Sequence, residues 1–113
     1  MTMAVTVAVH DGTDHTVVVP HGRLYYDTVE PLREVLAVLG ARERPHLVLD
    51  LSDVAVCDSS GLNLFAQTQV VAARHGGWLR LVGVQPNVRR VLVITNLTRL
   101  LKMFETVDAA LAG

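Results

Sequence analysis

The sequence predicts an α/β fold: a mixed sheet of four to five strands with an N-terminal antiparallel hairpin and about four helices packed against it. Strand-like and helix-like segments alternate with short breaks along all 113 residues, without repeats, linkers or low-complexity stretches. Asp11-Gly12, a turn signal, separates two short strand patterns near the N-terminus. Residues 46–51 form a nearly continuous apolar run, which is typical of a strand covered on both faces. We therefore expect one domain spanning residues 1–113.

The first half of the chain contains the hairpin and one helix. Residues 4–10 and 16–19 predict its two strands. Asp27 suits the N-cap of a helix, with Glu30 three residues later as in a capping box. Gly40 suits a left-handed end of that helix. One apolar stripe predicts its inner face: Val29, Leu32, Val35, Leu36 and Leu39.

The second half alternates strands and helices, which implies parallel pairing with right-handed crossovers. A short strand at residues 54–57 leads into a long helix that ends at about His75, before Gly76-Gly77. A strand at residues 78–82 is expected after it, followed by a helix from Pro86. The inner face of that helix would carry Val88, Val91, Leu92 and Thr95. A short strand within residues 100–104 and a helix capped by Thr106, which carries Val107, Ala110 and Leu111, complete the expected elements.

Composition excludes several classes of protein. Ten basic and 11 acidic residues give a net charge of −1, which argues against a nucleic-acid binder and against a polybasic membrane-surface protein. Cys57 is the single cysteine, so no internal disulfide can form and a reducing compartment is expected. No apolar run approaches the roughly 20 residues that span a bilayer, and no signal peptide is evident. We therefore expect a cytoplasmic protein.

The most informative motif is Asp58-Ser59-Ser60-Gly61, where a strand pattern meets a helix pattern. The first N–H groups of a helix are unpaired and its dipole is positive there, so an anion at this end is stabilised. A phosphate on Ser59 or Ser60 would therefore suit the fold and would add about −1.5 to −2 charge beside Asp58. Asp and Ser are also favoured helix caps, so this motif alone leaves a cap and a phosphorylation site open.

The wider pattern resembles the STAS-domain anti-sigma factor antagonists over most of the chain and in the correct order. The matching segments are Gly22-Arg23-Leu24, Leu49-Asp50-Leu51-Ser52, Cys57-Asp58-Ser59-Ser60-Gly61-Leu62-Asn63, Gly76-Gly77 with residues 78–82, Pro86-Asn87-Val88-Arg89-Arg90-Val91-Leu92, and Thr95-Asn96-Leu97 into Met103-Phe104.

The resemblance implies a phosphorylation switch at the second serine of the motif, Ser60. In that family the unphosphorylated antagonist binds an anti-sigma factor that is also an ATP-dependent serine kinase, and so releases a sigma factor. Phosphorylation ends the binding, and a separate serine phosphatase restores it. The chain departs from the family pattern at Tyr25, where members often carry an aspartate close to the phosphorylation site. Asp27, two residues later, is a candidate substitute.

The helix after Ser60 also offers a candidate partner surface. A helical projection places Leu62, Phe65, Ala66, Val70 and Ala73 on the core face. Leu64 and Val71 fall on the opposite side with Gln67, and Asn63 flanks them. We expect these four residues to bind the partner together with Asp58, Ser59 and Gly61, and we expect Leu64 to contribute little to stability. Scattered exposed apolar residues are also common without any function.

Other functions have less support. The five histidines lack metal-ligand spacing, so no metal site is expected, and no cofactor motif such as a glycine-rich phosphate loop occurs. Cys57 suits a small buried apolar residue better than a nucleophile. The first rival function is a STAS adaptor in a stress-sensing or transporter complex, without a serine switch. The second is a small enzyme, since catalytic triads can assemble from distant residues; the favoured expectation is that the protein is not an enzyme.

Overall fold

The computed structural model describes residues 5–113, which form one five-stranded mixed sheet in the order β1-β2-β3-β4-β5. The hairpin is antiparallel, and the other strands pair in parallel. This topology confirms the predicted fold class, although residue 4 of the predicted first strand lies outside the described residues. The strands are β1 (Thr6–Asp11), β2 (Thr16–His21), β3 (His46–Asp50), β4 (Trp78–Val82) and β5 (Met103–Phe104).

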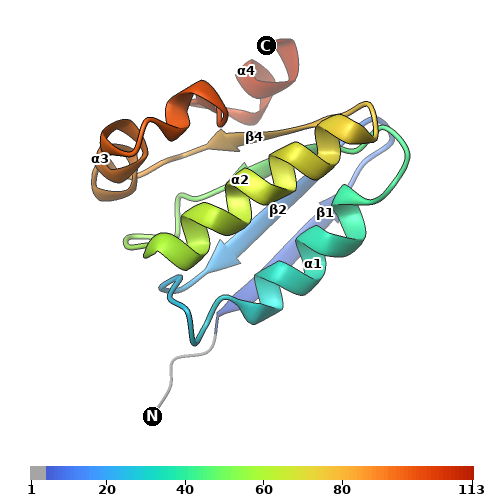
Figure 1. The fold of residues 1–113 in the computed structure, drawn as a ribbon. Coiled ribbons are helices and arrows are strands. Elements are labelled where there is room, and N and C mark those ends of the chain that lie inside the picture. Colours follow the sequence, from blue (N-terminus) through green and yellow to red (C-terminus); the bar gives the residue numbers. More distant parts are fainter. Residues whose placement is uncertain (1–4) are drawn as a thin grey trace.

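Within the described residues, four α-helices and one short 3-10 turn connect and cover the sheet. Helices α1 and α2 lie side by side on one face (Figure 1), and buried residues of α3 join the same core. Helix α4 packs against β4 and β5 with a separate small cluster of Val48, Val82 and Ala110. The helical elements are α1 (Glu30–Gly40), α2 (Ser59–Arg74), α3 (Pro86–Ile94), the 3-10 turn η1 (Leu97–Arg99) and α4 (Val107–Ala112).

Strand β3 explains the apolar run that the sequence shows. Successive side chains of a strand point to opposite faces of the sheet. Leu47 and Leu49 therefore enter the core beneath α1 and α2, while Val48 enters the small cluster beneath α4. Because helices cover both faces here, all three residues are apolar and buried.

The face of the sheet beneath α4 contains a stack of flat side chains. The rings of His46 and Trp78 are parallel within 16°, with their centres 4.9 Å apart. The guanidinium of Arg80 lies 3.9 Å from the centre of the Trp78 ring and donates a 2.7 Å hydrogen bond from Nη1 to the carbonyl of Ala110. Arg80 thus links the sheet to α4.

The start of α1 differs from the prediction. The helix begins at Glu30, its N-cap position is Val29 without a side-chain hydrogen bond, and Asp27 is exposed. The physical reason is a turn closed by Thr28, whose hydroxyl donates to the carbonyl of Arg23 (2.6 Å) and accepts from the N–H of Tyr25 (2.9 Å). This turn delays the helix, so the predicted capping box does not form.

The end of α1 also differs from the prediction. Gly40 is the last helical residue but does not have a positive φ, so no left-handed cap forms there. It is buried, and a Cβ at this position would lie 3.7 Å from Cγ2 of Thr68 on α2. The glycine therefore serves the close packing of α1 on α2 rather than a turn.

The chain between β3 and α2 is a loop rather than the predicted strand at 54–57. It forms only an isolated parallel bridge between Leu24 and Cys57. Three backbone hydrogen bonds hold it against residues 22–24: Gly22 N–H to Asp53 O, Leu24 N–H to Val56 O, and Asp58 N–H to Leu24 O, at 3.4, 3.2 and 2.9 Å. The loop is therefore fixed in place as it delivers Asp58 to the start of α2.

Cys57 packs closely against the first turn of α2. A Cβ on Gly61 would collide with the Cys57 sulfur, so only glycine fits at that position. Burial raises the pKa of the Cys57 thiol to about 12, and the neighbouring Asp58 carboxylate adds to the rise. The thiol therefore stays protonated at neutral pH, as expected of a packed residue rather than a nucleophile.

Helix α2 buries a different face from the one predicted. Leu62 and Phe65 are buried as expected, but Val70 and Ala73 are exposed, and Leu64 is only 5% exposed. The cause is α1, which packs along the side of α2, so α2 is covered by the sheet on one side and by α1 on another. The expectation that Leu64 faces outward and contributes little to stability is therefore wrong.

We predict that Leu64→Ala lowers the free energy of unfolding by about 2–3 kcal/mol. This value is in the lower part of the range for buried Leu→Ala changes, because Leu64 borders a surface groove. Urea unfolding followed by circular dichroism measures the change. Val38→Ala on α1, which is 67% exposed, is the matched control and should shift stability by less than about 0.5 kcal/mol. Equal effects of the two changes would contradict the burial of Leu64.

We predict that native Cys57 reacts with iodoacetamide at pH 8 at least about a thousandfold more slowly than the same residue in the unfolded chain. A thiol with a pKa near 12 has almost no thiolate at that pH. Mass spectrometry of time points with and without urea measures both rates. Comparable rates in the two conditions would show that the thiol is exposed and ionised.

Candidate functional site

The candidate site is built around Asp58, the N-cap of α2. Its backbone is extended, and its Oδ1 accepts hydrogen bonds from the N–H groups of Ser60 at 2.9 Å and Gly61 at 3.4 Å. Ser59 and Ser60 are the first two residues of the helix. The predicted position of Ser60 at the start of a helix is therefore confirmed, and the residue is partly exposed, but a loop precedes it and not the expected strand.

The second oxygen of Asp58 binds a distant segment. Its Oδ2 accepts a 3.0 Å hydrogen bond from the N–H of Tyr26, 32 residues away. One carboxylate thus joins the start of α2 to the turn before α1. Sequence reasoning missed Tyr26, and a residue pattern offers no signal for it, because the contact is made by backbone N–H rather than by the side chain.

The two residues expected near the predicted phosphorylation site differ in their exposure. Tyr25 is partly buried, and its carbonyl accepts hydrogen bonds from the N–H groups of Thr28 and Val29 at 3.0 and 2.9 Å. Asp27 is exposed on the same turn. Among the described residues, the carboxylate that contacts the start of α2 is that of Asp58 rather than that of Asp27.

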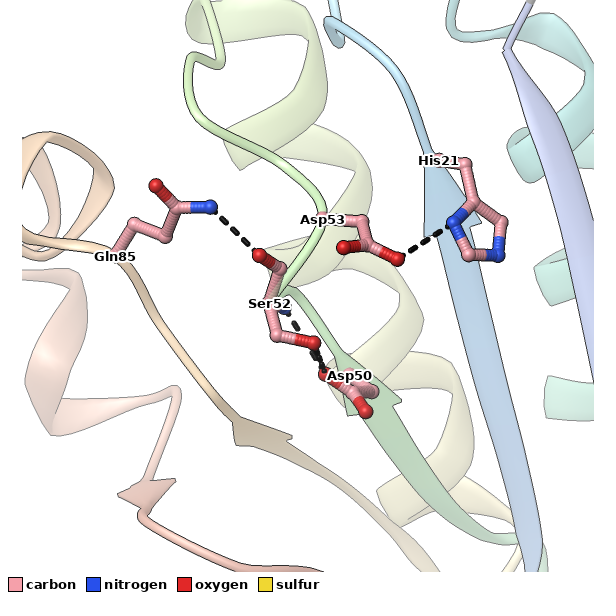
Figure 2. Close-up of polar contacts among 5 residues, drawn as sticks. All are labelled: His21, Asp50, Ser52, Asp53 and Gln85. Atoms are coloured by element: carbon pink, nitrogen blue, oxygen red, sulfur yellow. Dashed lines mark hydrogen bonds and ion pairs between the residues drawn. The ribbon is translucent and has the colours of Figure 1, made fainter.

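Polar contacts at the end of β3 anchor the loop that leads to the site (Figure 2). Asp50 Oδ1 accepts from both the N–H and the hydroxyl of Ser52, at 3.0 and 2.7 Å. Gln85 Nε2 donates to the Ser52 carbonyl at 2.6 Å. Gly83, with φ of 64°, leaves room beside them, since a Cβ there would lie 3.0 Å from Cβ of Ser52.

A second contact holds the same loop from the side of β2. His21 Nδ1 and Asp53 Oδ2 lie 2.7 Å apart, and Figure 2 shows them facing each other across the gap between β2 and the loop. Both side chains are about half exposed. The loop is thus attached on both flanks, so Asp58 and the two serines have a defined position.

The residues predicted to bind a partner fall into two groups. Ser59 and Asn63 are exposed near the start of α2, whereas Gly61, in the first turn of the same helix, is buried. Further along, Gln67 and Val71 line a groove of about 270 Å³ between α1 and α2, together with buried Leu64. The other lining residues are Arg33, Leu36, Ala37 and Thr68. Leu64 therefore contributes to the groove wall, not to an outward-facing patch.

Within residues 5–113, no three His, Cys, Asp or Glu side chains are grouped in a way that could hold a metal ion. In the same described range, no helix is both long enough and apolar enough to cross a bilayer.

Comparison with known proteins identifies the fold and the family. A Thermotoga neapolitana protein provisionally named as an anti-sigma factor antagonist is 38% identical over 65 residues, which cover 58% of this chain and 58% of the relative. The match thus spans little more than half the length of that curated relative.

Solved structures match over almost the whole chain. The crystal structure of an anti-sigma factor antagonist from Mycobacterium paratuberculosis superposes with a TM-score of 0.85 at 29% identity, covering 96% of this chain and 92% of that one. A crystal structure from Thermotoga maritima, at 24% identity and a TM-score of 0.81, covers 94% and 92% of the two chains and shares the fold. The sequence model of the STAS domain matches residues 4–110. The chain therefore belongs to the STAS domain family.

Proposed function

We propose that the protein is an anti-sigma factor antagonist whose binding is switched by phosphorylation of Ser60. The observation that supports the proposal most is the position of Ser60, partly exposed in the first turn of α2, with its N–H held by Asp58. The relatives named as anti-sigma factor antagonists point to the same role. In this proposal the unphosphorylated protein binds an anti-sigma factor and so releases a sigma factor.

The physics of the helix terminus favours a switch that leaves the fold intact. A phosphate on Ser60 would lie at the positive end of the α2 dipole, which stabilises a negative charge by about 0.3–1 kcal/mol. The same charge would also lie close to the Asp58 carboxylate, which already caps the helix. In a complex, both charges would lose water, and an unpaired buried charge costs about 2–5 kcal/mol. Phosphorylation would thus weaken binding far more than folding.

The proposed partners follow from this switch. The anti-sigma factor acts as an ATP-dependent serine kinase on Ser60, and a separate serine phosphatase reverses the reaction in the cytoplasm. The proposed partner surface has three parts. At the start of α2 it comprises Asp58, Ser59, Gly61 and Asn63, and in the groove it comprises Gln67 and Val71, with Leu64 in the groove wall. Tyr25 and Asp27 contribute from the turn before α1. The protein acts by binding and not as an enzyme, and the proposal includes no metal, cofactor, nucleic acid or membrane.

We predict that Ser60→Ala binds the anti-sigma factor kinase as wild type does and accepts no phosphate. Ser60→Asp should bind at least about 30-fold more weakly, because burying its charge costs about 2 kcal/mol, which corresponds to that factor in affinity. Aspartate has less charge than phosphoserine, so this lower end is the expected size. Calorimetric titration against purified kinases of the source organism measures affinity, and radiolabelled ATP measures phosphate transfer.

Ser59→Ala is the matched control, since it removes the neighbouring, more exposed hydroxyl of the same helix turn. It should be labelled as wild type is. Because Ser59 lies in the proposed partner surface, this variant should lose some affinity, but less than Ser60→Asp does. Labelling of Ser60→Ala at the wild-type level, or equal affinities of all variants, would reject Ser60 as the switch. A domain that binds its partner equally in all these forms would instead act as a STAS adaptor.

A further inference from the structure

Tyr26 is an unusually exposed aromatic residue beside the candidate site. Its side chain is 79% exposed, the highest fraction among the large hydrophobic side chains of residues 5–113. Single exposed apolar residues are common on protein surfaces, so exposure alone indicates nothing. Here, however, the same residue donates its N–H to Asp58, the N-cap of the helix that begins with Ser59 and Ser60.

Hydrogen bonds from Thr28, Tyr25 and Asp58 hold the turn that bears Tyr26. The Thr28 hydroxyl joins the N–H of Tyr25 to the carbonyl of Arg23, and the Tyr25 carbonyl accepts two backbone hydrogen bonds. Asp58 fixes the backbone of Tyr26 from outside the turn. The backbone beneath the ring is therefore ordered before any partner arrives, and tyrosine has only two side-chain torsions to fix on binding, so its entropic cost at an interface is small.

We infer that Tyr26 is an aromatic anchor through which the protein binds the anti-sigma factor kinase. The inference rests on the proposed function, because a kinase that phosphorylates Ser60 must cover the surface around that hydroxyl. Tyr26 lies within that surface, since one carboxylate binds both its N–H and the N–H of Ser60. The matching feature of the partner is an apolar hollow with a hydrogen-bond acceptor for the phenol group, the setting in which buried tyrosines act as binding hot spots.

The hydrogen bonds of Asp58 also fix the position of Tyr26 relative to Ser60. Both Tyr26 and Ser60 are positioned by Asp58, so their spacing is set by hydrogen bonds within the protein and not by the partner. A kinase surface that accepts the Tyr26 ring is thereby aligned with the Ser60 hydroxyl. Loss of the ring should therefore weaken encounter and alignment while leaving the chemistry of phosphate transfer unchanged.

The test compares Tyr26→Ala, Tyr26→Phe and the control Val38→Ala, which removes an exposed apolar side chain from α1. The probe is each purified anti-sigma factor kinase of the source organism, titrated without ATP. Tyr26→Ala should bind about 10- to 100-fold more weakly, Tyr26→Phe should recover at least half of the loss on a logarithmic scale, and Val38→Ala should bind as wild type does. In phosphate-transfer assays Tyr26→Ala should raise KM and leave kcat within about twofold.

Thermal unfolding must show the same Tm for wild type and Tyr26→Ala, which separates binding from stability. Wild-type affinity of Tyr26→Ala, with Ser60→Asp still weakened, would overturn the anchor and leave the proposed function standing. Weak binding of Tyr26→Ala with wild-type affinity of Ser60→Asp would support the anchor and overturn the switch. If no kinase binds wild-type protein, both proposals fail.

Discussion

The carboxylate of Asp58 is the contact on which the arrangement of the site depends. Its two oxygens accept hydrogen bonds from three N–H groups, two in the first turn of α2 and one in Tyr26. A helix start needs such acceptors because its first N–H groups have no partner within the helix. The same carboxylate accepts hydrogen bonds from the helix start and from the N–H of Tyr26. It thereby couples two segments that lie 32 residues apart in the sequence. A neutral replacement with a single acceptor oxygen could serve only one of them well.

The position of Asp58 in turn depends on close packing below it. Gly61 leaves room for the sulfur of Cys57, and the loop before Cys57 is bound to residues 22–24 by backbone hydrogen bonds. The polar contacts of Asp50 and Asp53 then hold the beginning of this loop. These polar side chains thus serve to hold the loop. The candidate binding surface is what remains after these internal bonds are made: two hydroxyls, one aromatic ring and the groove.

The order of strands and helices could be predicted from the sequence because each element has a strong local pattern, such as the apolar run of β3 and the cap of α2. The errors arise where tertiary packing decides. A helical projection assumes one buried face, and α2 has two, so Leu64 was assigned to the wrong side. Asp27 has the composition of a cap, but the hydroxyl of Thr28 closes a turn first. The position of Ser60 at a helix start could be predicted from the sequence. The contact of Tyr26 with Asp58 could not, because it involves backbone atoms and a loop geometry that residue types do not encode.

The stack beneath α4 gives this protein an optical property of its own. Trp78 is the single tryptophan of the chain, and it lies between the imidazole of His46 and the guanidinium of Arg80, which is bound to the backbone of α4. Its fluorescence therefore arises from one defined environment, and undocking of α4 would expose more of the indole to water. Helix α2 lies on the opposite face of the sheet. The tryptophan emission thus observes the back of the sheet and the attachment of α4, whereas the aromatic side chains beside Ser60 are tyrosines.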